Sequence, residues 1–331
     1  MGTDMADKKV VILMAVYNGQ EYLKEQLDSI INQTFTSWEL LIRDDCSGDK
    51  TPEIIEGYAR LDSRIKILDN KGKNLGAAGN FFELLKNAPD ADYYAFSDQD
   101  DYWYPGKVER AVKKLEELCE AGDKLNEEPK ISDTNNDATG GGCDFPAAYC
   151  GAKEITDGEL NVKSVSAFKA PRLTWENALV ENLCTGCTCM INRKLEDMLV
   201  KDIPEYTVMH DWWIYMIAVS LGKVYYDEKP YIKYRQHSDN AYGDIQGTIS
   251  LWKYRFSQLF AAGGNTYRQI ECFLDVYGKY LTPEMKNTAV LLVKSKHSLK
   301  ARLCILKNGI VFRQTAGDNR VARFLVLTGK L

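Results

Sequence analysis

The chain has 331 residues, of which 45% are hydrophobic and 27% are charged, a composition that is typical of globular proteins and excludes a disordered chain. Its net charge of −5 disfavours a nucleic-acid partner. Its longest apolar run, Val10–Tyr17, is far below the roughly 18 residues that a transmembrane helix needs. Residues 1–9 are polar and lack the apolar core of a signal peptide. We therefore expect a disordered leader and a cytoplasmic protein, which can act at the inner face of the cell membrane.

Strands and helices alternate along residues 10–119. Val10–Val16 is a continuous apolar run, as expected for a strand that is buried on both faces. Further strands are predicted at 39–42, 64–68 and 92–97, and helices at 21–33, from 51, at 79–88 and from 105. This alternation predicts an α/β fold with a Rossmann-like, mostly parallel sheet flanked by helices.

The composition changes after residue 119. Residues 120–146 are rich in Asn, Asp, Gly and Glu and predict a long, variable surface loop. Strand and helix patterns resume over 147–244, and residues 245–331 form a helical extension. The end of the chain is basic, because residues 291–331 contain nine Lys and Arg and one acidic residue, whereas the rest of the chain carries a net charge of −13.

The nine cysteines are scattered through a long chain without a secretion signal, which favours reduced thiols. Cys184, Cys187 and Cys189 lie close together in sequence. No fourth zinc ligand is evident nearby, so buried thiols are the better interpretation.

Polar residues follow three of the predicted strands. Ligands of open α/β sheets bind beyond the carboxyl ends of the strands, and the residues at these ends are Tyr17, Asp44, Asp45, Asp98, Gln99, Asp100 and Asp101. Asp98 and Asp100 project to the same side of an extended chain. Two oxygen ligands on one side suit Mg²⁺ or Mn²⁺. The competing interpretation is a solvated acidic turn before the helix from residue 105.

The Asp44-Asp45 pair permits recognition of a pyrimidine base. Uracil and thymine present an N3–H donor that a carboxylate can accept, and Tyr17 can stack on the base. An Asx turn before the next helix is the alternative. Neither Gly-x-Gly-x-x-Gly after the first strand nor Gly-Lys-Ser/Thr occurs, which counts against a dinucleotide-dependent dehydrogenase and a P-loop enzyme.

Seven segments resemble glycosyltransferase family 2, of the GT-A type, and most of all its bacterial rhamnosyltransferases of cell-wall and O-antigen polysaccharide synthesis. They are Ala15–Leu27, Arg43–Thr51, Asn74–Phe82, Phe96–Pro105, Thr185–Arg193, His210–Trp213 and Tyr234–Asn240. The resemblance implies a catalytic domain at 10–244, with a nucleotide-sugar half at 10–119 and an acceptor half at 147–244. Cys46 stands where the family usually has Gly, and the 120–146 loop is atypical.

The resemblance also implies a role for each matching residue. Asp211 falls at the position of the catalytic base, and the ligands of a divalent cation (Mn²⁺ or Mg²⁺) fall at Asp98, Asp100 and His237. The implied nucleotide-sugar residues are Ala15, Tyr17, Asp45, Asn74, Gly76, Asp98 and Gln99. The residues expected on the acceptor or sugar side are Trp103, Thr185, Gly186 and Trp212.

The chemistry requires one base and one displacement. An acceptor hydroxyl attacks the anomeric carbon opposite the diphosphate, so a carboxylate on that face must take the proton and the carbon inverts. Asp211 precedes two tryptophans, whose apolar rings can supply a water-poor wall for a base. An Asp at this position is also typical of a helix N-cap, and Glu205 is the nearest rival base.

The expected donor is dTDP-L-rhamnose, and the expected acceptor is a hydroxyl of a growing, lipid-linked cell-surface polysaccharide. UDP-glucose and UDP-galactose would use the same uracil-type contacts. The rivals from other classes are a non-catalytic sugar-nucleotide-binding protein and a nucleotidyltransferase. Residues 299–312 mix basic with apolar side chains, which indicates either contact with an anionic membrane surface or a helix packed on the catalytic domain.

Overall fold

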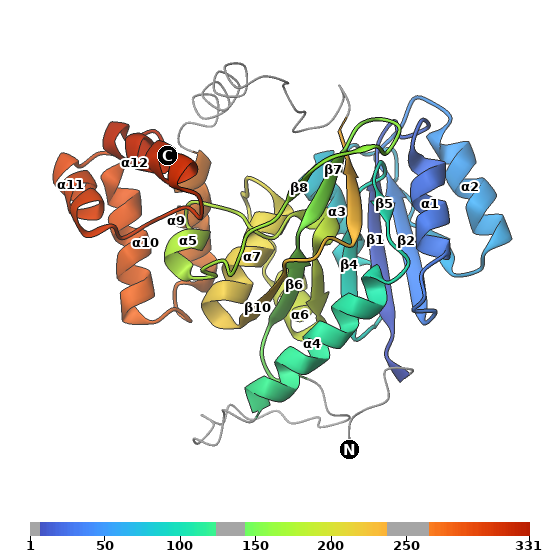
Figure 1. Cartoon of the computed structure of the whole chain (residues 1–331), viewed down its shortest axis with the longest axis horizontal. Coiled ribbons are helices and arrows are strands. Elements are labelled where there is room, and N and C mark those ends of the chain that lie inside the picture. The colour runs from blue at the N-terminus through green and yellow to red at the C-terminus, as the bar shows by residue number, and fades with distance from the viewer. Residues whose placement is uncertain (1–6, 124–142, 237–264) are drawn as a thin grey trace.

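The computed structural model describes residues 7–123, 143–236 and 265–331. A central sheet has helices on both faces, and a group of helices from the end of the chain lies at one side (Figure 1). This arrangement confirms the predicted α/β class with its mostly parallel sheet and C-terminal helical extension. The strands are β1 (Val10–Val16), β2 (Trp38–Asp44), β3 (Ile65–Ile67), β4 (Tyr93–Ser97), β5 (Tyr102–Trp103), β6 (Ala147–Gly151), β7 (Lys153–Thr156), β8 (Val162–Ser166), β9 (Met190–Asn192), β10 (Lys223–Asp227) and β11 (Ile232–Arg235).

The α-helices are α1 (Leu23–Ile31), α2 (Thr51–Leu61), α3 (Gly76–Lys86), α4 (Lys107–Asp123), α5 (Trp175–Ala178), α6 (Arg193–Lys201), α7 (His210–Leu221), α9 (Asn265–Tyr277), α10 (Pro283–Ser295), α11 (Leu299–Asn308) and α12 (Ala316–Thr328). A short 3-10 turn, Gly186–Thr188, precedes β9. α4 extends to Asp123, into the segment predicted as a loop from residue 120. The rest of that loop up to 142, residues 1–6 of the expected leader 1–9, and residues 237–264 lie outside the described residues.

In the described part of the chain, seven strands form the main sheet in the order β10-β6-β9-β4-β1-β2-β3. Neighbours are parallel except β9, which is antiparallel to both β4 and β6. Because parallel strands share a direction, β1, β2 and β4 end at one edge of the sheet. The polar residues that follow these strands therefore meet at that edge, as their position in the sequence predicts.

β1 shows why the centre of the sheet is apolar on both faces. Val10, Ile12 and Met14 pack into one hydrophobic cluster with residues of α1 and α4, whereas Val11 and Leu13 pack into another with residues of α3 and α7. All five side chains are fully buried. A strand that is covered on both sides needs apolar side chains at successive positions, which explains its continuous apolar run.

A second sheet, with the order β5-β11-β7-β8 among the described residues, lies beside the first. β4 ends at Ser97 in the main sheet, and β5 starts at Tyr102 in the second sheet. The four residues between them therefore cross from one sheet to the other. This crossing places the acidic segment 98–101 between two rigid layers.

The helices α9 and α10 pack on the main domain. Phe273 and Tyr277 of α9 contact the ring of Trp213 in α7, with centroids 5.2 and 6.1 Å apart. Trp175 of α5 donates a hydrogen bond of 2.9 Å to the carbonyl of Met285 in α10. These contacts make the C-terminal helices part of one core. None of the described helices combines the length and apolar character that crossing a bilayer requires.

Cys119 near the end of α4 and Cys143 before β6 form a disulfide, which corrects the expectation that the cysteines are reduced. Their Cα atoms lie 5.2 Å apart, a separation that a disulfide can span. The sequence could not show this pairing, because it depends on how the chain returns to the sheet after the loop. Cys184, Cys187 and Cys189 are buried free thiols, as expected.

Candidate active site

The loops after β1 and β2 are joined by side-chain hydrogen bonds. Ser47 Oγ accepts a hydrogen bond from the backbone N–H of Asn18, and Thr51 Oγ1 accepts one from Gly19, both at 2.8 Å. These bonds hold the ends of the two strands in fixed relative positions. The ring of Tyr17 remains exposed at this edge.

Gln99 connects the loop after β4 to the end of β1. Its side-chain amide accepts a hydrogen bond from the Tyr17 N–H at 2.7 Å and donates one to the Tyr17 carbonyl at 2.9 Å. A Cβ atom at Gly19 would lie 2.7 Å from Gln99 Oε1, so a larger residue at position 19 would displace this amide. Gln99 therefore lies where it was predicted, and it positions the backbone of the strand end.

Asp45 is buried and is held by three protein donors. Its carboxylate accepts hydrogen bonds from Arg43 Nη1 at 2.6 Å and from the backbone N–H groups of Leu75 and Gly76 at 2.8 Å. Both backbone donors lie at the start of α3, where unpaired N–H groups favour a carboxylate. Asn74 donates to the Asp45 carbonyl at 2.8 Å. The structure thus brings Asp45, Asn74 and Gly76 together, and these contacts anchor α3 to β2.

The acidic segment between the sheets concentrates negative charge. Burial, and then the nearby carboxylates of Asp100 and Asp211, raise the pKa of Asp98 to about 7. Asp101 is fully buried, and burial raises its pKa well above the usual value. Among the described residues, no donor reaches Asp101 Oδ2. Carboxylates this close are costly to ionise unless a cation neutralises them.

Arg235 of β11 holds the backbone of this segment, although the sequence analysis did not single it out. Its backbone N–H donates to Asp101 Oδ1 at 3.1 Å, and its Nε donates to the Asp100 carbonyl at 2.7 Å. Its guanidinium also pairs with Glu25 of α1 and donates to the carbonyl of Gly158. The sequence could have pointed to Arg235 because it lies in Tyr234–Asn240, one of the seven segments that resemble the family.

Asp98 lies in a group of side chains that can hold a metal ion. Among the described residues, the ligand atoms of Asp98, Asp101 and Cys187 lie within 4.8 Å of one another, so the group contains Asp101 in place of the predicted ligand Asp100. Carboxylate oxygens suit Mg²⁺ or Mn²⁺, and burial, followed by the charges of Asp100 and Asp211, raises the pKa of Asp98. The two carboxylates therefore fit a divalent cation, whereas burial raises the pKa of the Cys187 thiol and makes it a poor ligand for these ions. The third predicted ligand, His237, lies outside the described residues.

Asp211 is positioned by one backbone donor. The N–H of Gly186 donates to Asp211 Oδ2 at 2.8 Å, whereas Oδ1 is buried and has no hydrogen-bond partner in the part of the chain that the structure describes. The N-cap of α7 is Met209, so Asp211 lies in the first turn and does not cap the helix. Its charge helps to raise the pKa of Asp98. The predicted base and a predicted metal ligand are therefore close enough to interact electrostatically.

His210, the neighbour of Asp211, is part of the wall of the site. Its ring packs against Phe81 and Phe96, with centroids 4.0 and 5.5 Å apart, and burial lowers its pKa. A Cβ atom at Gly186 would lie 3.0 Å from His210 Nε2 and 3.6 Å from Asp211 Oδ2. The close approach of the turn before β9 to α7 therefore favours glycine at position 186, because a larger residue would displace the His210 ring.

Lys153 is a cation in the site that the sequence analysis missed. Its Nζ donates a hydrogen bond of 3.2 Å to Thr185 Oγ1 and lies 4.1 Å from the ring centroid of Tyr234. Its positive charge lowers the pKa of Asp98. The sequence did offer a signal, because ligands of open α/β sheets bind beyond the carboxyl ends of the strands. Lys153 follows the end of β6 by two positions.

The two predicted tryptophans have different environments. Trp103 is fully buried in β5, and Lys107 Nζ lies 3.6 Å from its ring centroid, so it has no exposed surface for a sugar. Trp212 is partly buried and donates a hydrogen bond of 2.7 Å to the Ala178 carbonyl. Ala15 lies one position before the end of β1.

The fold and the acidic site agree with a glycosyltransferase, and comparisons with known proteins show this class and its family. The model for "Glycosyl transferase family 2" matches residues 11–126. The dTDP-rhamnosyl transferase RfbG of Shigella flexneri is 30% identical over 267 residues, which cover 77% of this chain and 81% of that protein. The UDP-Glc:alpha-D-GlcNAc-diphosphoundecaprenol beta-1,3-glucosyltransferase WfgD of Escherichia coli is 37% identical over 308 residues, covering 92% and 99%. The chain belongs to glycosyltransferase family 2.

A solved structure supports the architecture. The crystal structure of S. aureus TarS 1-349 in complex with UDP-GlcNAc superimposes with a TM-score of 0.54 and 14% identity, over 97% of this chain and 89% of that chain. At this identity the similarity concerns the fold alone. It agrees with a GT-A type α/β domain that continues into the C-terminal helices.

Proposed function

We propose that the enzyme transfers L-rhamnose from dTDP-L-rhamnose to a hydroxyl of a growing, lipid-linked cell-surface polysaccharide, with inversion of the anomeric carbon. The similarity to a dTDP-rhamnosyl transferase supports this donor. The similarity to a relative whose name specifies a sugar on diphosphoundecaprenol supports a lipid-linked acceptor.

The observation that carries the mechanism is the environment of Asp211. One carboxylate oxygen is fixed by Gly186, and the other is buried without a donor among the described residues. An acceptor hydroxyl that meets this second oxygen can donate its hydrogen bond and then lose its proton as it attacks the sugar. One base and one displacement invert the anomeric carbon. Thr185, Gly186 and Trp212, which lie next to this carboxylate in the chain or in space, are assigned to the acceptor side.

Asp98 and Asp100 are assigned to hold Mn²⁺ or Mg²⁺, and His237 is assigned as a further ligand on the family resemblance. When bound, the cation stabilises the charge that develops on the departing diphosphate. Lys153 supplies a second positive charge from this chain, beside Asp98. Its hydrogen bond to Thr185 keeps the ammonium group oriented.

The nucleotide is assigned to the edge formed by the ends of β1 and β2. Tyr17 is exposed and can stack on the base. Ala15 lies two residues earlier, near the end of β1. The N3–H of a pyrimidine is assigned to the Asp45 carboxylate on the family resemblance, and it would compete there with the four hydrogen bonds from Arg43, Leu75 and Gly76. Asn74 and Gly76 line the same side, and Gln99 holds the backbone of Tyr17.

UDP-glucose is the competing donor. It presents the same N3–H group as a thymine nucleotide, and the relative named as a UDP-Glc transferase matches nearly the whole chain. The N3–H contact does not distinguish the two donors, so selection depends on the transferred sugar, on the C5-methyl group of thymine and on the ribose 2′-hydroxyl of UDP.

The test is a donor panel. Release of dTDP or UDP is measured with dTDP-L-rhamnose, UDP-glucose and UDP-galactose, with Mn²⁺ and with a diphosphate-lipid-linked sugar as acceptor, and the anomeric configuration of the product is read by NMR. We expect dTDP-L-rhamnose to be turned over fastest, with inversion. Faster turnover of UDP-glucose would make it the donor in place of dTDP-L-rhamnose. A product that retains the anomeric configuration would contradict the single displacement. If no nucleotide is released from any donor, the proposed transferase activity is wrong.

A further inference from the structure

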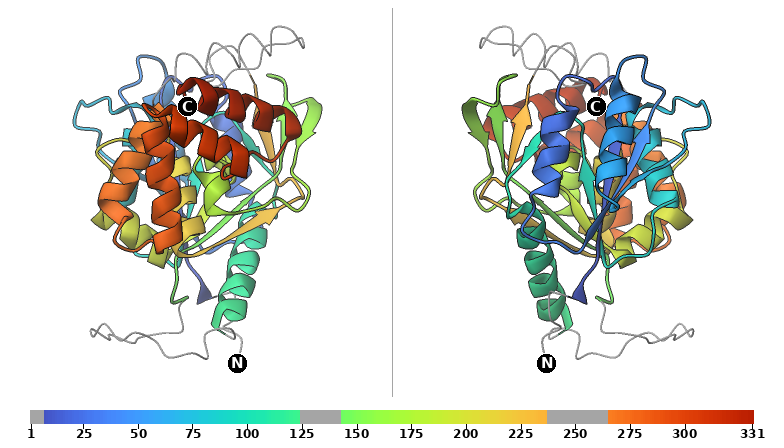
Figure 2. Two further views of the ribbon diagram at one scale, coloured as in Figure 1. Left: turned by 90° about the vertical axis from the view of Figure 1, so that its left-hand side faces the viewer. Right: turned by 90° about the vertical axis from the view of Figure 1, so that its right-hand side faces the viewer.

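The last two helices form a hairpin at the surface of the molecule. α11 and α12 lie against each other (Figures 1 and 2), and each donates to the backbone of the other. Arg302 Nη1 donates to the Leu327 carbonyl at 3.3 Å, and Arg323 Nη2 donates to the Leu306 carbonyl at 3.1 Å. One face of each helix, which includes Ala301, Ile305, Ala322 and Leu325, is buried.

The opposite faces carry large apolar side chains in contact with solvent. Leu299 and Leu303, one helical turn apart on α11, are 60% and 54% exposed, and Phe324 and Leu327 on α12 are 44% and 45% exposed. We name the surface of these four residues the outer face. Helices that only pack on a domain place polar residues at such positions, so packing on the domain does not explain the outer face.

Exposed cations surround these apolar side chains. Lys300 and Lys307 lie on α11, and Arg320 and Arg323 lie on α12. α11 contains no acidic residue, and the one acid of α12, Asp318, is hydrogen-bonded to Thr315 at 2.6 Å. The outer face is therefore both apolar and strongly positive, although the rest of the chain is acidic.

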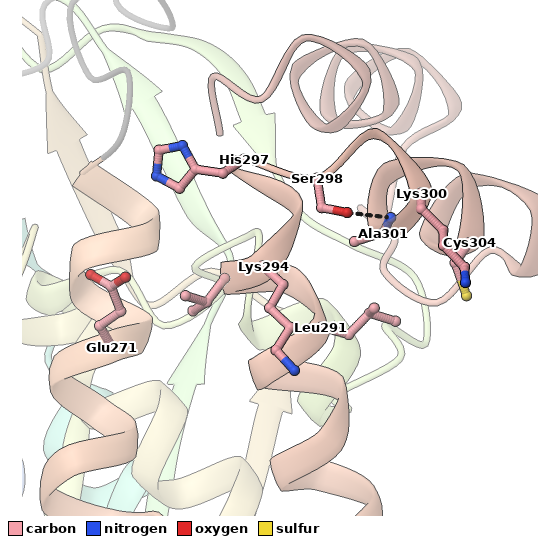
Figure 3. Close-up of a pocket in the computed structure, with 9 residues that line it drawn as sticks. Glu271, Leu291, Lys294, His297, Ser298, Lys300, Ala301 and Cys304 are labelled. Carbon is pink, nitrogen blue, oxygen red and sulfur yellow. Dashed lines mark hydrogen bonds between the residues drawn. The ribbon is translucent and has the colours of Figure 1, made fainter.

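A hollow of about 560 Å³ lies at the N-terminal end of α11, and its lining is also both apolar and basic. Three basic side chains, Lys294, His297 and Lys300, line it together with Leu291 and Cys304 (Figure 3). Its one acidic lining residue is Glu271 of α9. The hollow extends the positive surface from α11 to α10.

We propose that the outer face docks on the surface of an anionic phospholipid bilayer. The four apolar side chains enter the boundary between headgroups and acyl chains, and the basic side chains contact lipid phosphates. A protein partner fits less well, because lysine is depleted at the centre of protein interfaces and here it alternates with the apolar residues. The reason for membrane docking rests on the proposed function, since the enzyme would meet a lipid-linked acceptor at the surface of the bilayer.

The test is flotation of the full chain with vesicles, without donor or acceptor, so that its outcome is independent of the proposed transfer reaction. The vesicles contain phosphatidylcholine alone or with 30% phosphatidylglycerol. We expect binding to the anionic vesicles and little to the neutral ones. Each cation near the surface contributes about fivefold in affinity, so Lys300→Gln/Lys307→Gln should weaken binding about 30-fold. The matched control is Lys24→Gln/Lys66→Gln, which removes two exposed lysines from α1 and β3.

The apolar contribution has its own pair of variants. Leu303→Gln/Phe324→Gln should abolish flotation, whereas Leu61→Gln/Ile67→Gln should leave it unchanged, although those side chains are 88% and 46% exposed. Circular dichroism verifies that each variant is folded. Absence of wild-type binding to anionic vesicles, or equal binding by the outer-face and control variants, would overturn the proposal. Neither result would bear on glycosyl transfer measured with a detergent-solubilised acceptor.

Discussion

The backbone N–H of Gly186 fixes one oxygen of Asp211 at 2.8 Å and leaves the other buried, with no donor in the described residues. The two residues come from different elements, the turn before β9 and the first turn of α7. Orientation of the carboxylate therefore depends on a contact between segments that are 25 residues apart. The site can be tested through this contact and through its neighbours.

Asp211→Asn should remove the base and keep the shape of the site. The amide cannot take a proton, so kcat should fall by about 10²–10⁴-fold while donor affinity, measured by calorimetry, is unchanged. Glu205→Gln is the matched control, because Glu205 is exposed and was the rival base. A loss of kcat in the Glu205 variant with a near-normal Asp211 variant would move the base to Glu205.

Gly186→Ala should misplace the base. The added Cβ would lie 3.0 Å from His210 Nε2, so the ring must shift by a few tenths of an ångström, and 3.6 Å from Asp211 Oδ2, which is an ordinary contact. Misplacement of a reacting group by about 1 Å costs about 10²-fold in rate, so we expect this smaller shift beside the base to lower kcat by less than about 10²-fold with unchanged donor binding. Gly57→Ala in α2, where a Cβ meets no atom within 4 Å, is the control. Equal kcat in both variants would show that the contact is not needed.

Lys153→Met should weaken donor binding. The variant loses the ammonium group that lies beside Asp98 and donates a hydrogen bond to Thr185, and a positive charge at this place favours the negatively charged diphosphate of the donor. Calorimetric titration with the nucleotide sugar in the presence of Mn²⁺ should show lower donor affinity than in the wild type. Lys163→Met, at an exposed position of β8, should bind the donor like the wild type. A donor affinity that is indifferent to Lys153 would exclude its electrostatic role.

Asp98 should make the metal-free protein less stable as pH rises. Folding raises its pKa from 3.8 to about 7, so between these values the native state binds more protons than the unfolded state. The free energy of unfolding therefore falls as pH increases from about 4 to about 7, by at most about 1.4 kcal/mol per pH unit for this group. The free energy of unfolding is measured by urea titration in EDTA at pH 5, 6 and 7. It should fall less steeply with pH in Asp98→Asn than in the wild type. The same dependence on pH in both proteins would contradict the raised pKa of Asp98.

Asp45→Ala should destabilise the fold as well as donor binding. It leaves the buried Arg43 guanidinium without its carboxylate, the Leu75 N–H at the N-cap of α3 without its acceptor, and the Gly76 N–H with only its 3.2 Å hydrogen bond to Asn74 Oδ1. Breaking a buried ion pair costs about 3–5 kcal/mol. Asp62→Ala breaks the more exposed pair with Arg64 and should cost under about 1 kcal/mol in the same urea titration. Similar losses in both variants would mean that Asp45 does not anchor α3.

The polar edge of the sheet could be predicted because short, continuous segments of the sequence specify each strand and the residues at its end. The apolar run Val10–Val16 specifies a central strand, and the polar residues that follow it and β4 lie at the carboxyl ends that parallel strands share. Asp98 and Tyr17 could therefore be assigned to one edge. The boundary of α4 was missed because the composition changes at residue 120, before the helix ends at Asp123.

Contacts between distant segments could not be predicted in the same way. The hydrogen bond of Arg235 to Asp101 spans 134 residues, and Lys153 reaches Thr185 across 32. The burial of Trp103 also escaped prediction, because β5 has two residues and shows no periodicity. For such residues the sequence indicates chemical type, and the tertiary fold determines the partner.

β9 runs against both of its neighbours, so the chain enters this strand, and does not leave it, at the reactive edge. Thr185 and Gly186 consequently reach the edge from the opposite chain direction to Asp45 and Asp98. Under the proposed function, substitutions in the turn before β9 would therefore alter the acceptor side while leaving in place the strand ends to which the nucleotide sugar is assigned.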